Sequence, residues 1–157
     1  MNKATKFVHY VGLILFLGSI FTFGLISTLT KNTSLENLVF ARQVISTGTD
    51  YLTLPGLFLL IIAGLVIAPK YYHLPKHWWL NGKHILMLLI IINTIVFILP
   101  AEKRALELAI ESSAQGRLLS QYSEVYIKES IAGGVNVLLT FGSMIIAIFR
   151  MEKDPKN

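Results

Sequence analysis

Three ionisable side chains interrupt long apolar stretches of the sequence, namely His9, Lys83 and His84. Such groups are expensive to bury in lipid, so they are the first candidates for function. His9 lies about two residues inside the first apolar stretch, and Lys83 and His84 lie five or six residues inside the third. At 1.5 Å per helical residue these depths agree within ~6 Å. We therefore expect His9 and one of the other two to bind a common metal, with haem b held between them as one option.

A plainer interpretation of the same three residues is also open. A histidine this close to the end of a helix can reach the lipid headgroups, and Lys83 can extend along the helix towards water. Lys83 and His84 are neighbours, about 100° apart on a helix, and cannot both face one site. The residues alone do not choose between them.

The elements that position these side chains are four apolar stretches. Of the 157 residues 54% are hydrophobic and only 15% are charged, with a mean hydropathy of +0.61. Each stretch is near the ~20 residues that a helix needs to cross a bilayer, where the backbone must satisfy its own hydrogen bonds. We predict a single-domain, all-α integral membrane four-helix bundle with spans at 7–29, 51–68, 78–99 and 131–149.

The connections carry their own predictions. The segment 30–50 is expected to form a short amphipathic helix on the membrane surface, with Asp50 starting the second span. Pro69 and Pro75 bracket a short turn, which makes the second and third spans antiparallel neighbours. The Ala-, Leu- and Glu-rich segment 101–129 is expected to extend the helices beyond the membrane.

Uncharged small and polar residues recur inside the spans. Asn93 and Asn136 are expected to form hydrogen bonds between helices. Glycines are expected to let helices pack closely, although some could instead make room for a flat cofactor. These glycines include Gly12, Gly18, Gly24, Gly56, Gly64, Gly133, Gly134 and Gly142.

The net charge of +5 points to the membrane surface rather than to nucleic acid, because the basic residues gather at the ends of the apolar stretches. The side that holds both termini and the 69–77 turn has the denser positive charge. We therefore expect an inner-membrane protein of a bacterium with both termini in the cytoplasm. The expected partners are membrane lipid and a second copy of the chain, and the absence of cysteine excludes thiolate metal ligands.

Short motifs resemble a known membrane superfamily over about residues 5–105. They are Phe7-Val-His9-Tyr-Val-Gly12, Leu54-Pro55-Gly56 with Ala63-Gly64-Leu65, and Trp79-Leu80-Asn81-Gly82-Lys83. The superfamily includes HemJ-type protoporphyrinogen oxidases, the CopD-type copper-resistance membrane domain and the uncharacterised DUF2269 proteins. The HemJ-type Pro-Arg pair late in the first helix is replaced here by Gly24-Leu25-Ile26-Ser27, which favours the DUF2269-like branch.

The resemblance implies haem b with His9 and Lys83 as its axial ligands, and it matches a family arginine to Arg42. Arg42 precedes the second span, at the opposite membrane face from His9, so it cannot reach the propionates of a haem held there. Lys70, Lys76 and Tyr71, with Tyr72, lie at the correct end and are the expected propionate partners.

Three functions compete. The first is a haem b redox protein, an oxidoreductase of the protoporphyrinogen oxidase type with an electron-transfer partner or a quinone. The second is CopD-like handling of copper, for which Met87 and Met144 are the methionines inside spans. The third is an accessory membrane subunit without a cofactor.

Overall fold

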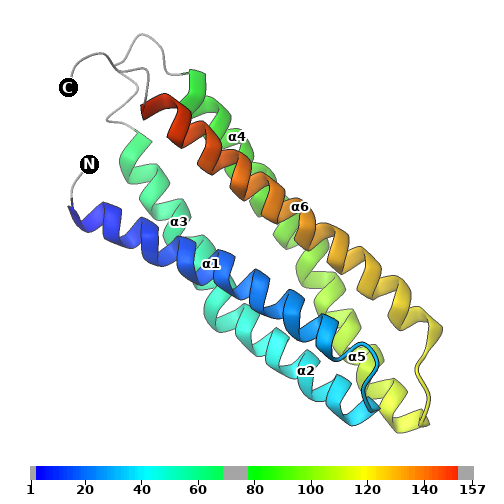
Figure 1. Ribbon diagram of the computed structural model, residues 1–157. Helices are drawn as coiled ribbons and strands as arrows, with labels where there is room; N and C mark the ends of the chain where they lie inside the picture. Colours follow the sequence, from blue (N-terminus) through cyan, green and yellow to red (C-terminus); the bar gives the residue numbers. More distant parts are fainter. Residues whose placement is uncertain (1–2, 69–77, 152–157) are drawn as a thin grey trace.

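The computed structural model describes residues 3–68 and 78–151. This part of the chain is helical and contains no strand, which confirms the all-α prediction there. The elements are α1 (Lys3–Leu29), α2 (Leu35–Gly48), η1 (Thr49–Thr53), α3 (Leu54–Ile67), α4 (Trp78–Asn93), η3 (Thr94–Ile98), α5 (Leu99–Gln115) and α6 (Ser120–Met151). Because η1 and η3 are helical turns that join their neighbours, the chain runs as four long helices (Figure 1).

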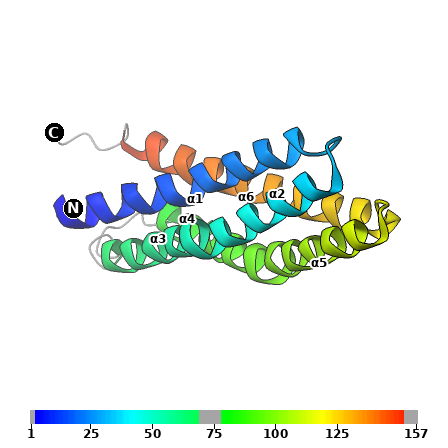
Figure 2. The same ribbon diagram turned by 90° about the horizontal axis from the view of Figure 1, so that it is seen from below.

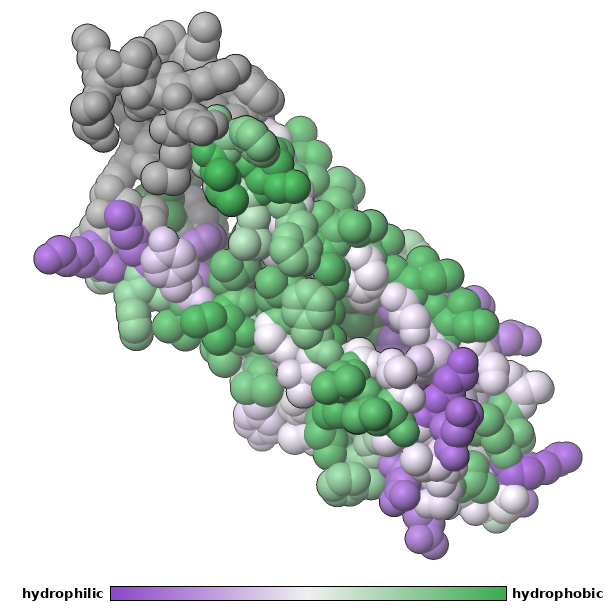
Figure 3. Space-filling model, viewed as in Figure 1, coloured by the Kyte–Doolittle hydropathy of each residue, from purple (hydrophilic) through white to green (hydrophobic). Residues whose placement is uncertain are grey.

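Within the described residues, four helices are long and apolar enough to cross a membrane. Their large apolar side chains often point outward rather than into a core; Ile14 and Leu138 are 71% and 73% exposed. Figure 3 shows one face of the molecule, with a broad hydrophobic middle and hydrophilic side chains towards the two ends. This distribution suits a lipid surround, since apolar area that faces lipid has no reason to be buried.

The helix predicted within 30–50 is present as α2, but it forms part of a longer helix rather than a separate one. After a short turn, Ser34 caps α2 by accepting a hydrogen bond from the Asn37 amide, at 3.4 Å. The helix then continues through η1 into α3 without a break. Asp50 therefore lies inside a continuous helix and does not start one.

Two prolines explain why the long helices widen at η1 and η3. Pro55 and Pro100 follow Leu54 and Leu99 in the first turns of α3 and α5. Proline has no N–H to donate to the preceding turn, and its ring crowds the carbonyl four residues back. The chain responds with a π-helical turn, in which Leu54 donates to the Thr49 carbonyl and Leu99 to the Thr94 carbonyl.

The expected helical extensions in 101–129 are confirmed as α5 and the first turns of α6. Gly116 ends α5 in the left-handed conformation, with φ of 66°. Its amide donates to the Ser113 carbonyl and the Arg117 amide to the Ser112 carbonyl, which satisfies the last turn of the helix.

The bundle is assembled from pairs of helices. α1 packs mainly on α3, α4 on α6, and α2 on α5, whereas α1 and α6 touch little. Figures 1 and 2 show α1 and α6 side by side along the long axis, with the first residues of α1 and the last turns of α6 at the same end. The interface between α1 and α6 is therefore the loosest side of the bundle.

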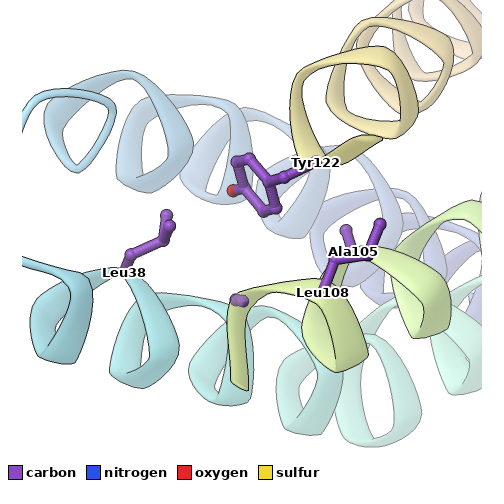
Figure 4. Close-up of a cluster of buried hydrophobic side chains, with 5 residues drawn as sticks. Leu38, Ala105, Leu108 and Tyr122 are labelled. Carbon is purple, nitrogen blue, oxygen red and sulfur yellow. The ribbon is translucent and has the colours of Figure 1, made fainter. Parts of the chain in front are cut away.

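Two apolar clusters hold the bundle together. One joins α1, α3 and α4 through Phe16, Leu57, Leu60 and Ile90. The other joins α2, α5 and α6 near the α1–α2 turn, and Figure 4 shows Leu38, Ala105, Leu108 and Tyr122 meeting there. The second cluster holds the helical extensions together at the end of the molecule away from the first turns of α1.

Candidate functional site

His9 and Lys83 line the same small pocket, which we call the His9 pocket. Its volume is about 90 Å³. Side chains from α1, α3, α4 and α6 surround it, so it lies where all four long helices meet. The structure thus places His9 of the first span and Lys83 of the third on one pocket.

Only some of the other predicted site residues can be placed relative to this pocket, because the structure does not describe all of them. His84, the neighbour of Lys83, is not among the residues that line it. Lys70, Lys76 and Tyr71 lie outside the described residues, as do Tyr72, Pro69 and Pro75. Of the candidates that the structure describes, the His9 pocket joins His9 with Lys83 alone.

Two methionines complete the donor set of the pocket. Met87 of α4 and Met144 of α6 both line it, although 57 residues separate them in the sequence. The Nδ1 atom of His9 is buried and has no hydrogen-bond partner in the described part of the chain. A buried nitrogen without a partner is costly unless a ligand takes its place. Besides the Lys83 amine and the hydroxyls of Thr140 and Ser143, the pocket therefore offers one imidazole nitrogen and two thioether sulfurs.

Haem b does not fit the His9 pocket as the helices stand. Its axial donors are present, since His9 and Lys83 can each supply a nitrogen. A pocket for a ligand of that size measures at least about 300 Å³, whereas this one holds about 90 Å³. A single ion fits the volume. Among residues 3–68 and 78–151, no group of three or more His, Cys, Asp or Glu side chains could hold a metal. The methionine sulfurs therefore determine which metal ion the pocket would favour.

A second buried polar site lies at the other end of the bundle, and sequence reasoning missed it. Arg42 of α2 is only 1% exposed. Its Nη1 donates to Glu129 Oε2 at 2.6 Å and its Nε to the Tyr122 hydroxyl at 2.8 Å. The guanidinium carbon lies 5.2 Å and 5.6 Å from the ring centres of Tyr122 and Tyr126. We call these four residues the Arg42 cluster; its partners lie 80 or more residues away in sequence, so no local pattern could predict it.

Beside the Arg42 cluster lies a larger cavity, which we call the Glu102 cavity. Its volume is about 600 Å³, and Glu102 and Glu129 both line it. Glu102 is only 4% exposed and accepts a hydrogen bond from the Thr49 hydroxyl, at 2.6 Å. Glu102 lies just after the third apolar stretch. This position at the edge of a predicted span was the only feature of the sequence that pointed to a site here.

The two asparagines behave as predicted. Asn93 Nδ2 donates to Asn136 Oδ1 at 2.7 Å and to the Ala132 carbonyl at 2.8 Å. Asn136 Nδ2 donates in turn to the Thr94 hydroxyl, at 2.8 Å. This ladder joins α4 and η3 to α6 and lies between the levels of the two cavities, since Asn136 and Thr94 also line the Glu102 cavity.

Comparison with known proteins gives no relative. No protein-family model matches the chain, and neither a search of curated proteins nor a search of solved structures finds a similar one. The function must therefore be argued from the two sites.

Proposed function

We propose that this chain is an integral membrane four-helix bundle that binds and handles monovalent copper at His9, Met87 and Met144. The observation that carries the proposal is that one pocket of about 90 Å³ collects these three side chains from α1, α4 and α6. Thioether sulfur is a soft ligand that selects Cu(I), and imidazole also suits copper. Zinc and iron sites favour thiolate, imidazole and carboxylate sets that the described residues do not gather.

The membrane setting belongs to the same proposal. Four helices have the length and apolarity of membrane spans, and their outward side chains are largely apolar. The denser positive charge beside the termini favours a cytoplasmic location for both ends, in the inner membrane of a bacterium. A pocket at the meeting point of all four helices could then hold the ion away from water.

Cu(I) binding to the purified full-length protein tests the proposal. The metal is supplied with ascorbate under anaerobic conditions, and its affinity is measured by competition with a coloured Cu(I) chelator. We expect one ion per chain. Met87→Leu and Met144→Leu should each weaken binding at least about tenfold, because leucine keeps the volume of methionine but removes the sulfur. Leu13→Ile is the matched control, since Leu13 lines the same pocket and supplies no donor.

An absorption spectrum of the same preparation, oxidised and reduced, separates copper from haem b. A Soret band that is lost in His9→Ala and Lys83→Leu but kept in Met87→Leu would overturn the copper proposal and support the haem expectation. Protein that binds neither copper nor haem would support a cofactor-free subunit. In the copper proposal Lys83→Leu keeps all three ligands, so binding of Cu(I) should survive that substitution.

A further inference from the structure

The Glu102 cavity is a large feature of the bundle that the copper proposal does not use. It lies between α1, η1, η3 and α6, and its volume of about 600 Å³ is in the range of sites for small organic ligands. Its walls are mainly apolar, with Ile20, Phe23, Ile45 and Val137 among them. Polar side chains, Glu102 and Glu129 among them, also line it, and an apolar wall with placed polar groups is the usual composition of a ligand site.

Missing side chains create this cavity. Gly24 of α1 and Gly133 and Gly134 of α6 line it, and a Cβ atom added to any of them would meet nothing within 4 Å. The glycines Gly12 and Gly56 differ, because there a Cβ atom would lie within about 3 Å of the facing helix. The sequence left open whether the glycines pack helices or make room for a ligand. In the structure, Gly12 and Gly56 let two helices pack closely, whereas Gly24, Gly133 and Gly134 leave open space.

Both π-helical turns border the same cavity. Thr49 and Thr53 of η1 line it from one side, and Thr94 and Ile98 of η3 line it from another. π-helical turns in long helices are rare and occur frequently at functional sites. Two of them, produced by two Leu-Pro pairs in different helices, widen the bundle at one level.

Several of the hydroxyl groups in the cavity already donate their protons within the protein. The hydroxyl proton of Thr49 is used by Glu102, and that of Thr94 by the Ile90 carbonyl at 2.8 Å. The Thr53 and Ser19 hydroxyls share a hydrogen bond of 2.8 Å. Two carboxyl groups line the site; Glu129 is already paired with the Arg42 guanidinium, whereas Glu102 has no ion-pair partner among the described residues. A ligand that brings donors and a positive charge would complement Glu102.

The open side of the cavity lies along the loosest interface of the bundle. Phe21 and Leu25 of α1 line it and are 53% and 59% exposed, so this wall also faces the surroundings. α6 contributes the glycines opposite. In a bilayer, an amphipathic molecule could pass between α1 and α6 directly from the lipid.

We infer that the Glu102 cavity binds an amphipathic organic amine. Its protonated ammonium group would lie at Glu102, next to the Glu129–Arg42 pair, and its hydrocarbon part would fill the apolar space beside Gly24 and Gly133. This inference goes beyond the copper proposal, because the two sites share no lining residue. Either can fail without the other.

Octylamine is a suitable probe, since an alkylamine carries a proton at pH 7 as lysine does. Its binding to the full-length protein in phosphatidylcholine nanodiscs is measured by titration calorimetry, with empty nanodiscs subtracted. Octanol and octanoate match its chain length and differ in charge. We expect octylamine to bind at least about tenfold more tightly than octanol, and octanoate not to bind, because a carboxylate ligand would be repelled by Glu102. Equal affinities, tighter binding of octanoate, or no binding of octylamine would overturn the inference.

Substitutions at the glycines locate the binding site. Gly133→Leu should fill the cavity and weaken octylamine binding at least about tenfold, because its side chain enters space that the ligand needs. Gly64→Leu is its control, since Gly64 also faces open space but does not line the cavity. Gly24→Leu with Gly18→Leu as control repeats the test on α1 and keeps it decisive if Gly133→Leu does not fold. Glu102→Gln should abolish the preference for octylamine over octanol. Unchanged binding in both Gly133→Leu and Gly24→Leu would contradict the location.

Discussion

At the scale of single residues, Arg42 is a charged side chain that is almost fully buried, with 1% of its surface exposed. Burying a guanidinium is expensive, and only well-placed partners compensate for it. Glu129 supplies the opposite charge at 2.6 Å, Tyr122 an acceptor at 2.8 Å, and the Tyr122 and Tyr126 rings an electron-rich face. The Nη2 atom is buried without a hydrogen-bond partner in the described residues. The cluster thus depends on Glu129 to balance the charge.

Removal of Glu129 should therefore destabilise the fold strongly. We expect Glu129→Ala to lower the free energy of unfolding by about 3–5 kcal/mol, because it leaves a buried charge without a partner. Glu107→Ala is the matched control, since Glu107 pairs with Arg104 at 2.9 Å on the exposed surface. That substitution should change stability little, as exposed ion pairs contribute little. The measurement is unfolding in mixed micelles of increasing dodecyl sulfate content, followed by circular dichroism. Similar losses for both variants would contradict a special role for Arg42.

The sequence identified part of these residue-scale features. The cost of burying charge in an apolar stretch singled out His9 and Lys83, and the structure places both on one pocket. Burial cost could not single out Met87 and Met144, because thioethers are apolar and cost nothing to bury. Arg42 precedes the second apolar stretch, so its burial depends on Tyr122 and Glu129 of α6, and this contact is fixed only by the tertiary fold.

At the scale of elements, the closest helix pair is α1 with α3. The two backbones approach where Gly12 faces Gly56. A Cβ atom on Gly56 would lie 2.6 Å from the Phe16 backbone nitrogen and 3.0 Å from the Gly12 carbonyl oxygen. Neither backbone atom can move alone, so the helices would have to separate.

Gly56→Ala should accordingly loosen this crossing. We expect the free energy of unfolding to fall by roughly 1–3 kcal/mol, the usual cost of inserting a methyl group into a tightly packed interface. Gly64→Ala on the same helix meets open space and should be neutral or stabilising, because alanine favours a helix over glycine. The same dodecyl sulfate titration measures both. A stable Gly56→Ala variant would mean that α1 and α3 can shift at little cost.

The boundaries of the elements show where sequence patterns stop being informative. Asp50 is a residue type that often begins helices, yet it lies in η1 inside a continuous helix. Asp50 does not distinguish the two cases, because the same polar residue types are exposed where a continuous helix widens before Pro55 and where a new helix begins. The apolar stretches themselves were informative, since every described helix that could cross a membrane contains one. Helices in the segments now seen as α2 and α5 were predicted from the sequence, whereas their packing on one another through the Leu38–Leu108–Tyr122 cluster is fixed only by the tertiary fold.

At the scale of the whole molecule, the two sites occupy different levels of one bundle. The His9 pocket lies among the first turns of α1, and the Glu102 cavity lies beside its second half. Both are inside the bundle, and the loosely packed α1–α6 interface runs past the larger one. The proposed copper site would therefore lie nearer one membrane face and the proposed amine site nearer the other. The direction in which the chain inserts into the membrane determines which site lies near the cytoplasmic face and which lies near the outer face.

The direction of insertion can be measured cleanly because the chain has no cysteine. Each introduced cysteine is the only thiol, so a membrane-impermeant maleimide reports one position at a time. In intact spheroplasts we expect Asn32→Cys and Arg117→Cys to be labelled and Lys3→Cys to be labelled only after permeabilisation, because the denser positive charge favours cytoplasmic termini. Ile14→Cys, on an outward apolar surface, should resist labelling in both conditions since lipid excludes the polar reagent. Labelling of Lys3→Cys alone in intact spheroplasts would invert the topology and place the His9 pocket near the outer face. If Asn32→Cys and Arg117→Cys were labelled from different sides, the α1–α2 and α5–α6 turns could not share a membrane face, and the four-span arrangement would be wrong.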